Sequence, residues 1–76
     1  MVRCKFRCHY KDAQNVGTEH EYALIKMSPV SSGSKENEEF FKYTPGGDLC
    51  FYSVNLAAAA QIEQGKEYYI DISPAE

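Results

Sequence analysis

The stretch that decides the fold runs from Val2 to Lys11, reads VRCKFRCHYK, and alternates apolar and basic residues throughout. Successive side chains of a β-strand point to opposite faces of a sheet, so a strict period of two is typical of a half-buried strand. The stretch therefore predicts a strand with one face toward the core and one basic face. The basic face consists of Arg3, Lys5, Arg7, His9 and Lys11.

This basic face stands out because the chain as a whole is acidic, with eight Lys and Arg residues, eleven Asp and Glu residues and a net charge of −3. A local concentration of cations can attract an anion even when the net charge is negative. Two other interpretations stay open. The face could be solvated, as the charged side chains of edge strands are, or it could be neutralised by Glu19 and Glu21 on the next strand.

The length of 76 residues predicts a single domain, 1–76, because nothing in the composition marks a boundary. A chain of this size buries only about 60% of its unfolded surface, so association into a homo-oligomer is expected. A hydrophobic content of 43%, with six Tyr and four Phe residues, is too high for a disordered chain.

The three cysteines do not predict a disulfide framework. Cys4 and Cys8 lie on one face of the same strand about 13 Å apart, beyond disulfide reach. We expect them and Cys50 to be reduced, buried residues, with no metal and no cofactor. Residues 1–15 contain no apolar signal-peptide core, and no apolar run is long enough for a membrane span. These features predict a cytoplasmic protein that does not enter membranes.

The rest of the chain predicts three more strands and two short helices. The strands are expected over residues 19–27, 48–54 and 67–72, and the helices over 36–43 and 56–62. For residues 36–44 an extended conformation leading into a turn at Pro45 is the alternative. The order predicts an α+β fold, with a small antiparallel sheet or partly open β-barrel of about four strands and two short helices. Strands two and three are apolar on both faces, which favours a covering partner.

The segment from Ser31 to Lys35 contains a glycine and leads into the first expected helix, with Ser34 as its N-cap. Such a loop can present backbone N–H groups to a phosphate, although the spacing of a phosphate-binding Walker loop is absent. A flexible serine loop is the simpler interpretation. Aromatic side chains, among them Tyr10 and Tyr69, could stack on a base. The candidate ligand-binding residues are Arg3, Lys5, Arg7, His9, Ser32, Gly33, Ser34, Lys35, Phe41 and Tyr43.

Several motifs in residues 20–76 occur in a characteristic order. They are Ser32-Gly33-Ser34, Glu36-Asn37, Phe41 to Pro45, Val54-Asn55, Ala57 to Ala60, Gly65 to Tyr69, and Asp71 to Glu76. In this order the chain resembles a group of short, mostly uncharacterised proteins encoded by tailed bacteriophages. The resemblance implies a phage origin, life in the host cell cytoplasm and a stand-alone small domain, but no reaction. Small phage proteins of this kind usually act by binding, either inhibiting a host protein or sequestering nucleotide immune signals.

These observations predict a non-catalytic viral protein rather than an enzyme, because no catalytic motif accompanies the candidate residues. The leading hypothesis is an anti-defence protein that sequesters an anionic small molecule, such as a cyclic nucleotide, in a pocket between protomers. The alternative is a protein–protein inhibitor of a host enzyme. A single-strand nucleic-acid-binding module is a further hypothesis, against which the net negative charge argues.

Overall fold

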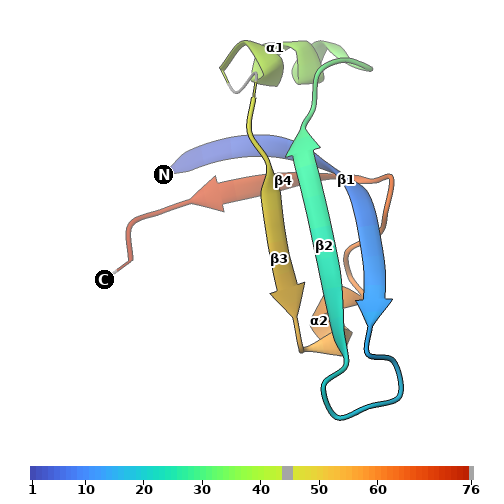
Figure 1. The fold of residues 1–76 in the computed structure, drawn as a ribbon. Coiled ribbons are helices and arrows are strands. Elements are labelled where there is room, and N and C mark those ends of the chain that lie inside the picture. Colours follow the sequence, from blue (N-terminus) through green and yellow to red (C-terminus); the bar gives the residue numbers. More distant parts are fainter. Residues whose placement is uncertain (44–45, 76) are drawn as a thin grey trace.

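The chain is built on one four-stranded antiparallel sheet, shown in Figure 1 for a computed structural model that describes residues 1–43 and 46–75. The elements in chain order are β1 (Val2–Gln14), β2 (Tyr22–Pro29), α1 (Lys35–Tyr43), β3 (Leu49–Ser53), α2 (Leu56–Ala59) and β4 (Glu67–Ile72). The strand order is β3-β2-β1-β4. The expected α+β fold is confirmed, and residues 36–43 are helical, whereas residue 44 and the turn expected at Pro45 lie outside the described residues. Because β3 and β4 are the two edges of this sheet, the barrel stays open.

β1 is the long central strand, and its two halves pair with different neighbours. Residues 2–7 pair with β4, and residues 6–14 pair with β2. His9 has no partner in β2, because Cys8 faces Met27 and Tyr10 faces Lys26, the adjacent residue of β2. Such a β-bulge bends a strand and increases its twist. In Figure 1 the first half of β1 and β4 therefore run across the direction of β2 and β3.

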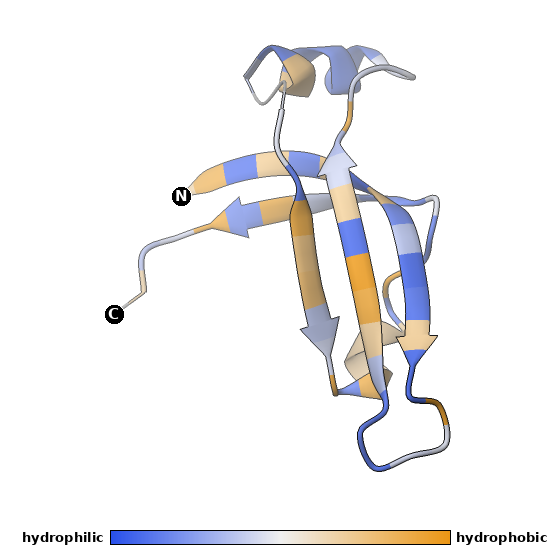
Figure 2. Ribbon diagram, viewed as in Figure 1, coloured by the Kyte–Doolittle hydropathy of each residue, from blue (hydrophilic) through white to orange (hydrophobic). Residues whose placement is uncertain are grey.

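Because of the bulge, the predicted alternation of β1 does not continue past His9. The prediction is confirmed at Cys4, Phe6 and Cys8, which are buried, whereas Val2 is 59% exposed. Figure 2 shows apolar and hydrophilic residues alternating along this half. After His9 the two faces exchange, because one extra residue shifts the side-chain order by one position. Tyr10, expected in the core, is 37% exposed. Lys11, expected on the basic face, points the other way, and its Nζ donates to two backbone carbonyls at Ala59 and Ile62, at 2.8 and 2.7 Å.

The core lies on the side of the sheet that we call the inner face, between the two crossing halves. Its buried residues are Cys4, Phe6, Cys8, Ala23, Ile25, Met27 and Ala59, with Leu49, Phe51, Ile62, Tyr68 and Ile70 packed against them. Cys4 and Cys8 are buried as expected, but Cys50 is exposed. Leu49 and Phe51 are the residues of β3 that face inward, so Cys50 between them faces outward.

The two helices lie against opposite faces of the sheet. α2 covers the inner face with the buried Ala59, and Asn55 caps it by accepting the N–H of Ala58 at 3.0 Å. α2 ends at Ala59, three residues earlier than expected. α1 lies against the other side, which carries Arg3, Lys5 and Arg7 and which we call the outer face. Among the described residues, no helix has the length and apolar character to cross a bilayer.

Candidate functional site

The outer face has two different regions, and the first contains two residues of the predicted basic face, Arg3 and Lys5. The register places Arg3 opposite Asp71, Lys5 opposite Tyr69 and Arg7 opposite Glu67 of β4. The first turn of α1 lies over the same place. We call this the ion-pair region, and it consists of Arg3, Lys5, Glu36, Glu67, Tyr69 and Asp71.

Arg3 is paired with Asp71 across the strands. Its Nε and Nη2 atoms donate to the two carboxylate oxygens at 2.7 and 3.0 Å, a bidentate geometry. These hydrogen bonds raise the pKa of Arg3 and lower the pKa of Asp71. The guanidinium also lies 5.0 Å from the centre of the Tyr69 ring. Arg3 is therefore already bound to groups of this chain.

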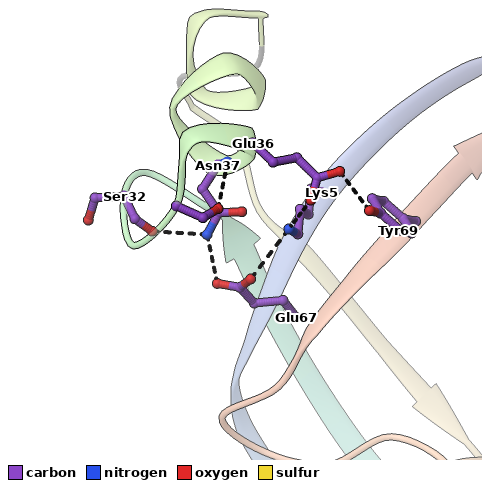
Figure 3. Close-up of polar contacts among 7 residues, drawn as sticks. Lys5, Ser32, Glu36, Asn37, Glu67 and Tyr69 are labelled. Carbon is purple, nitrogen blue, oxygen red and sulfur yellow. Dashed lines mark hydrogen bonds and ion pairs between the residues drawn. The ribbon is translucent and has the colours of Figure 1, made fainter.

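Lys5 is held between two carboxylates (Figure 3). Its Nζ lies 2.8 Å from Glu36 and 3.5 Å from Glu67, and its side chain is only 12% exposed. The hydroxyl of Tyr69 donates to the second oxygen of Glu36 at 2.7 Å. The hydrogen bonds from Lys5 and Tyr69 both lower the pKa of Glu36, and the one from Lys5 has the larger effect. The same bonds raise the pKa of Lys5 and of Tyr69.

The loop before α1 is fixed by hydrogen bonds of its own. Ser34 is the N-cap, as predicted, because its Oγ accepts the N–H of Asn37 at 3.0 Å. Asn37 is 2% exposed, and its Nδ2 donates to the Ser32 carbonyl and to Glu67, both at 2.9 Å. Figure 3 shows Asn37 pointing from α1 toward Glu67. Gly33 has a φ of +105°, which a residue with a side chain rarely adopts. The loop from Ser31 to Lys35, expected to be flexible or to bind phosphate, is thus held by hydrogen bonds to Asn37 of α1, and we call this set of contacts the brace.

Sequence reasoning missed Asn37 and Glu67. The sequence predicts Ser34 as the N-cap but assigns no role to residue 37. The role of Asn37 depends on β4 lying next to β1, and no local pattern specifies that pairing. The position of Asn37 in the first turn of an expected helix is the one signal that could have drawn attention to it.

The remaining predicted site residues do not meet at one place. Arg7 is exposed and has no ion-pair or hydrogen-bond partner among the described residues, and His9 Nδ1 lies 3.3 Å from Ser28 Oγ. Lys35, at the start of α1, is exposed. Phe41 and Tyr43 are 42% and 83% exposed. The aromatic residue of α1 that approaches the ion-pair region is their neighbour Phe40, 6.1 Å from Tyr69 between ring centres.

Two expectations about the basic face are wrong. β1 is a central strand, so its cations do not protect an edge. Arg3 and Lys5 are neutralised by carboxylates of β4 and α1 and not by Glu19 and Glu21. Arg7 lies opposite Ser28 of β2, and Glu19 and Glu21 precede the first residue of β2, Tyr22, at the far end of the hairpin. Carboxylates of this chain thus occupy the positions that an anionic ligand would need. The described residues enclose no pocket and contain no group of three metal-ligating side chains.

The second region of the outer face is apolar and lies over the second half of β1, β2 and β3. We call it the aromatic face, and it consists of Tyr10, Tyr22, Leu24, Cys50 and Tyr52, with Lys26 among them. Tyr52 is 68% exposed and Tyr10 37% exposed. No described element therefore covers this part of the sheet. The apolar character of both faces of β2 and β3 is the sequence signal that anticipates this surface.

The tyrosines of the aromatic face are held in place by contacts with each other and with neighbouring charges. Tyr22 and Tyr52 form an edge-to-face pair with ring centres 5.1 Å apart. Lys26 Nζ lies 5.3 Å from the centre of the Tyr10 ring, and the Tyr10 hydroxyl lies 3.4 Å from an Asp12 oxygen. The surface is therefore a set of ordered aromatic rings with one nearby cation and one nearby anion.

Comparisons of the chain with protein-family models, with curated proteins and with solved structures found no match.

Proposed function

We propose that this chain is a non-catalytic protein-binding domain that docks on a partner protein through the aromatic face. The observation that carries the proposal is the uncovered set of tyrosines on β1, β2 and β3, with Tyr52 68% exposed. Tyrosine is enriched among the residues that contribute most to protein–protein affinity, because it buries a large area with few rotatable bonds. Of the functions that the sequence suggests, inhibition of another protein agrees best with this surface.

The shape and charge of the surface support a protein as the ligand. Small molecules are usually bound in concave pockets, whereas the described part of this chain encloses none. A single-stranded nucleic acid needs a track of cations beside the stacked bases. Here Lys26 is balanced by Asp12, and the chain carries a net charge of −3. A nearly neutral aromatic surface without a pocket is more typical of a protein interface.

Sequestration of an anionic signal molecule is less well supported. It requires cations that are available to a ligand, and Arg3 and Lys5 are both bound to carboxylates of this chain. A ligand phosphate would have to displace Asp71 and Glu36, or rely on Arg7 alone. The aromatic face needs no such rearrangement.

The test compares two matched tyrosine variants in a binding experiment. The wild-type chain is immobilised in bacterial lysate, the phage resemblance guiding this choice, and the captured protein is purified for calorimetry. Tyr10→Ser with Tyr52→Ser should weaken binding by roughly 30-fold or more, because two anchor rings are lost. Tyr43→Ser removes a tyrosine of α1 that is even more exposed, at 83%, and should leave binding unchanged.

The same preparations distinguish the competing hypotheses. A panel of cyclic di- and trinucleotides and a polythymidine oligonucleotide should give no heat with the wild-type chain. Binding of a cyclic nucleotide that is lost in Arg7→Gln but kept in the Tyr10 and Tyr52 double variant would reject the proposal in favour of anion sequestration.

A further inference from the structure

β3 forms an edge of the sheet that has none of the usual protection. Its free side pairs with no described strand, and its five residues, LCFYS, include neither a charge nor a proline. Natural edge strands are commonly protected by charges, prolines or bulges, because an open edge pairs readily with another strand. The opposite edge, β4, carries Glu67 and Asp71, both in ion pairs. β3 is thus the edge that is open to another strand.

The inner face is incompletely covered on the side of this open edge. Along β1 the exposed fraction is 8% at Phe6 and 9% at Cys4 but 59% at Val2. Ile72, the partner of Val2 in β4, is 58% exposed. Figure 1 shows this end of β1 and β4 extending past β3. The apolar layer of β1 and β4 is therefore wider than the β2–β3 layer that covers it, and a strand added beside β3 would extend that cover.

The dimensions of the chain also indicate that part of its apolar surface is left uncovered. The radius of gyration is 14.0 Å, whereas a compact chain of this length would have one of roughly 11 Å. The accessible surface is 5533 Å², roughly 800 Å² more than expected for a monomer of this mass. An excess of that size is about what one partner contributes to a protein–protein interface of standard size.

We propose that β3 pairs in antiparallel register with β3 of a second copy, about a twofold axis through Phe51. In this register Leu49 faces the partner's Ser53, Cys50 faces the partner's Tyr52, and Phe51 faces its own copy. None of these pairs contains a charge, so the twofold symmetry brings no like charges together. The added strand extends the β2–β3 layer and shields Val2 and Ile72.

A second copy fits this edge for two reasons. The same five residues satisfy both sides of the seam, as an interface between identical surfaces requires. In one copy the β2–β3 layer is too narrow to cover the apolar layer of β1 and β4. The β2–β3 layer of the second copy widens it. The dimer also places the two aromatic faces side by side, because Cys50 and Tyr52 point outward along the seam. This goes beyond the proposed protein binding, because it predicts two docking surfaces in each assembly.

The test is a charge-swap experiment read by size-exclusion chromatography with light scattering on the full chain. The acidic variant carries Cys50→Asp and Tyr52→Asp, and the basic variant carries Cys50→Lys and Tyr52→Lys. Both side chains point away from the core, so circular dichroism should show that each variant keeps the fold. The wild-type chain should have the mass of two copies. Each variant alone should have the mass of one, because like charges meet along the seam, and an equimolar mixture should regain the mass of two.

Two single variants test where the contact lies. Ile72→Asp places a charge on the inner surface that the added strand covers, and should raise the dimer dissociation constant about tenfold or more. Tyr10→Ser alters the aromatic face two strands away from the seam and should leave the dimer intact.

Three results would overturn the proposal. They are a wild-type chain with the mass of one copy at high concentration, an acidic variant that remains dimeric, and a mixture that stays monomeric while both variants are folded. A dimer that is abolished by Tyr10→Ser but not by Ile72→Asp would instead assign the contact to packing of two aromatic faces. None of these results decides whether the aromatic face binds a foreign protein, which is tested with Tyr43→Ser as control.

Discussion

The ion-pair region and the aromatic face lie on the same side of the same sheet, yet they differ in what they leave available. In the ion-pair region Arg3 and Lys5 are bound by carboxylates from β4 and α1. On the aromatic face the rings of Tyr10 and Tyr52 contact solvent. The comparison teaches that a concentration of charge in the sequence does not measure the charge available for binding. Carboxylates that are distant in sequence pair with these cations when the chain folds. An uncovered apolar surface has no such partner within the chain.

The largest effect on stability should come from the buried polar brace of the ion-pair region. Asn37→Ala removes the donor to the Ser32 carbonyl and to Glu67, and should reduce the free energy of unfolding by about 2–4 kcal/mol. The physical reason is that the Ser32 carbonyl and the Glu67 carboxylate each lose a hydrogen bond from a buried donor. Urea unfolding followed by circular dichroism measures the change.

Two controls show whether this effect belongs to the ion-pair region. Glu38→Ala changes an exposed residue of the same helix and should leave the unfolding midpoint nearly unchanged. Tyr52→Ser should cost much less than Asn37→Ala, because the side chain is largely solvated. Equal losses in Asn37→Ala and Tyr52→Ser would remove the distinction between a structural and an available surface.

A smaller effect is expected at the N-cap of α1. Ser34→Ala removes the oxygen that accepts the N–H of Asn37, and should reduce the free energy of unfolding by about 1 kcal/mol. Ser31→Ala, at an exposed position of the same loop, is the matched control. If both variants unfold at the same urea concentration, the loop is not the brace that these contacts indicate.

The smallest effect should be a loss of stability in acid. Glu36 and Asp71 have a folded pKa below the usual value because Lys5 and Arg3 hydrogen-bond their ionised forms. The unfolded chain then binds more protons near pH 4, so this contribution is complete above that pH and is lost as the pH falls through the folded pKa. Both carboxylates are partly exposed, 49% for Glu36 and 41% for Asp71, which keeps the effect modest.

The acid effect is measured by urea unfolding at several pH values for the wild type and for Glu36→Gln with Asp71→Asn. The double variant should show a flatter dependence of stability on pH below about 5. Identical curves for the two proteins would mean that the ion pairs do not form in solution. On the aromatic face, the ring resonances of Tyr22 and Tyr52, which contact each other, should show no change over the same pH range.

Much of the local structure follows from the sequence. Alternation predicts that Cys4, Phe6 and Cys8 of β1 are buried, and Ser34 predicts the N-cap of α1. Each of these depends on neighbours within a few residues along the chain, so periodicity and capping rules apply.

The predictions that failed depend on contacts between distant segments. The bulge at His9 exchanged the faces of Tyr10 and Lys11, because β2 sets the pairing and no residue of β1 specifies an extra position. The acids that neutralise the basic face come from Glu36 and Asp71, 31 and 68 residues from their partners. The sequence pattern could propose neutralisation, but it could not choose which acids provide it.

The amino-acid sequence by itself determined the element order, the hydrophobic face of β1 and the presence of basic side chains on its other face. Only the tertiary structure decided that Arg3 and Lys5 are already paired and that the tyrosines of β1, β2 and β3 form one uncovered surface. The physical reason is that burial within a strand follows a local period of two. Ion pairing and surface continuity depend instead on strand order and register, which only the folded chain establishes.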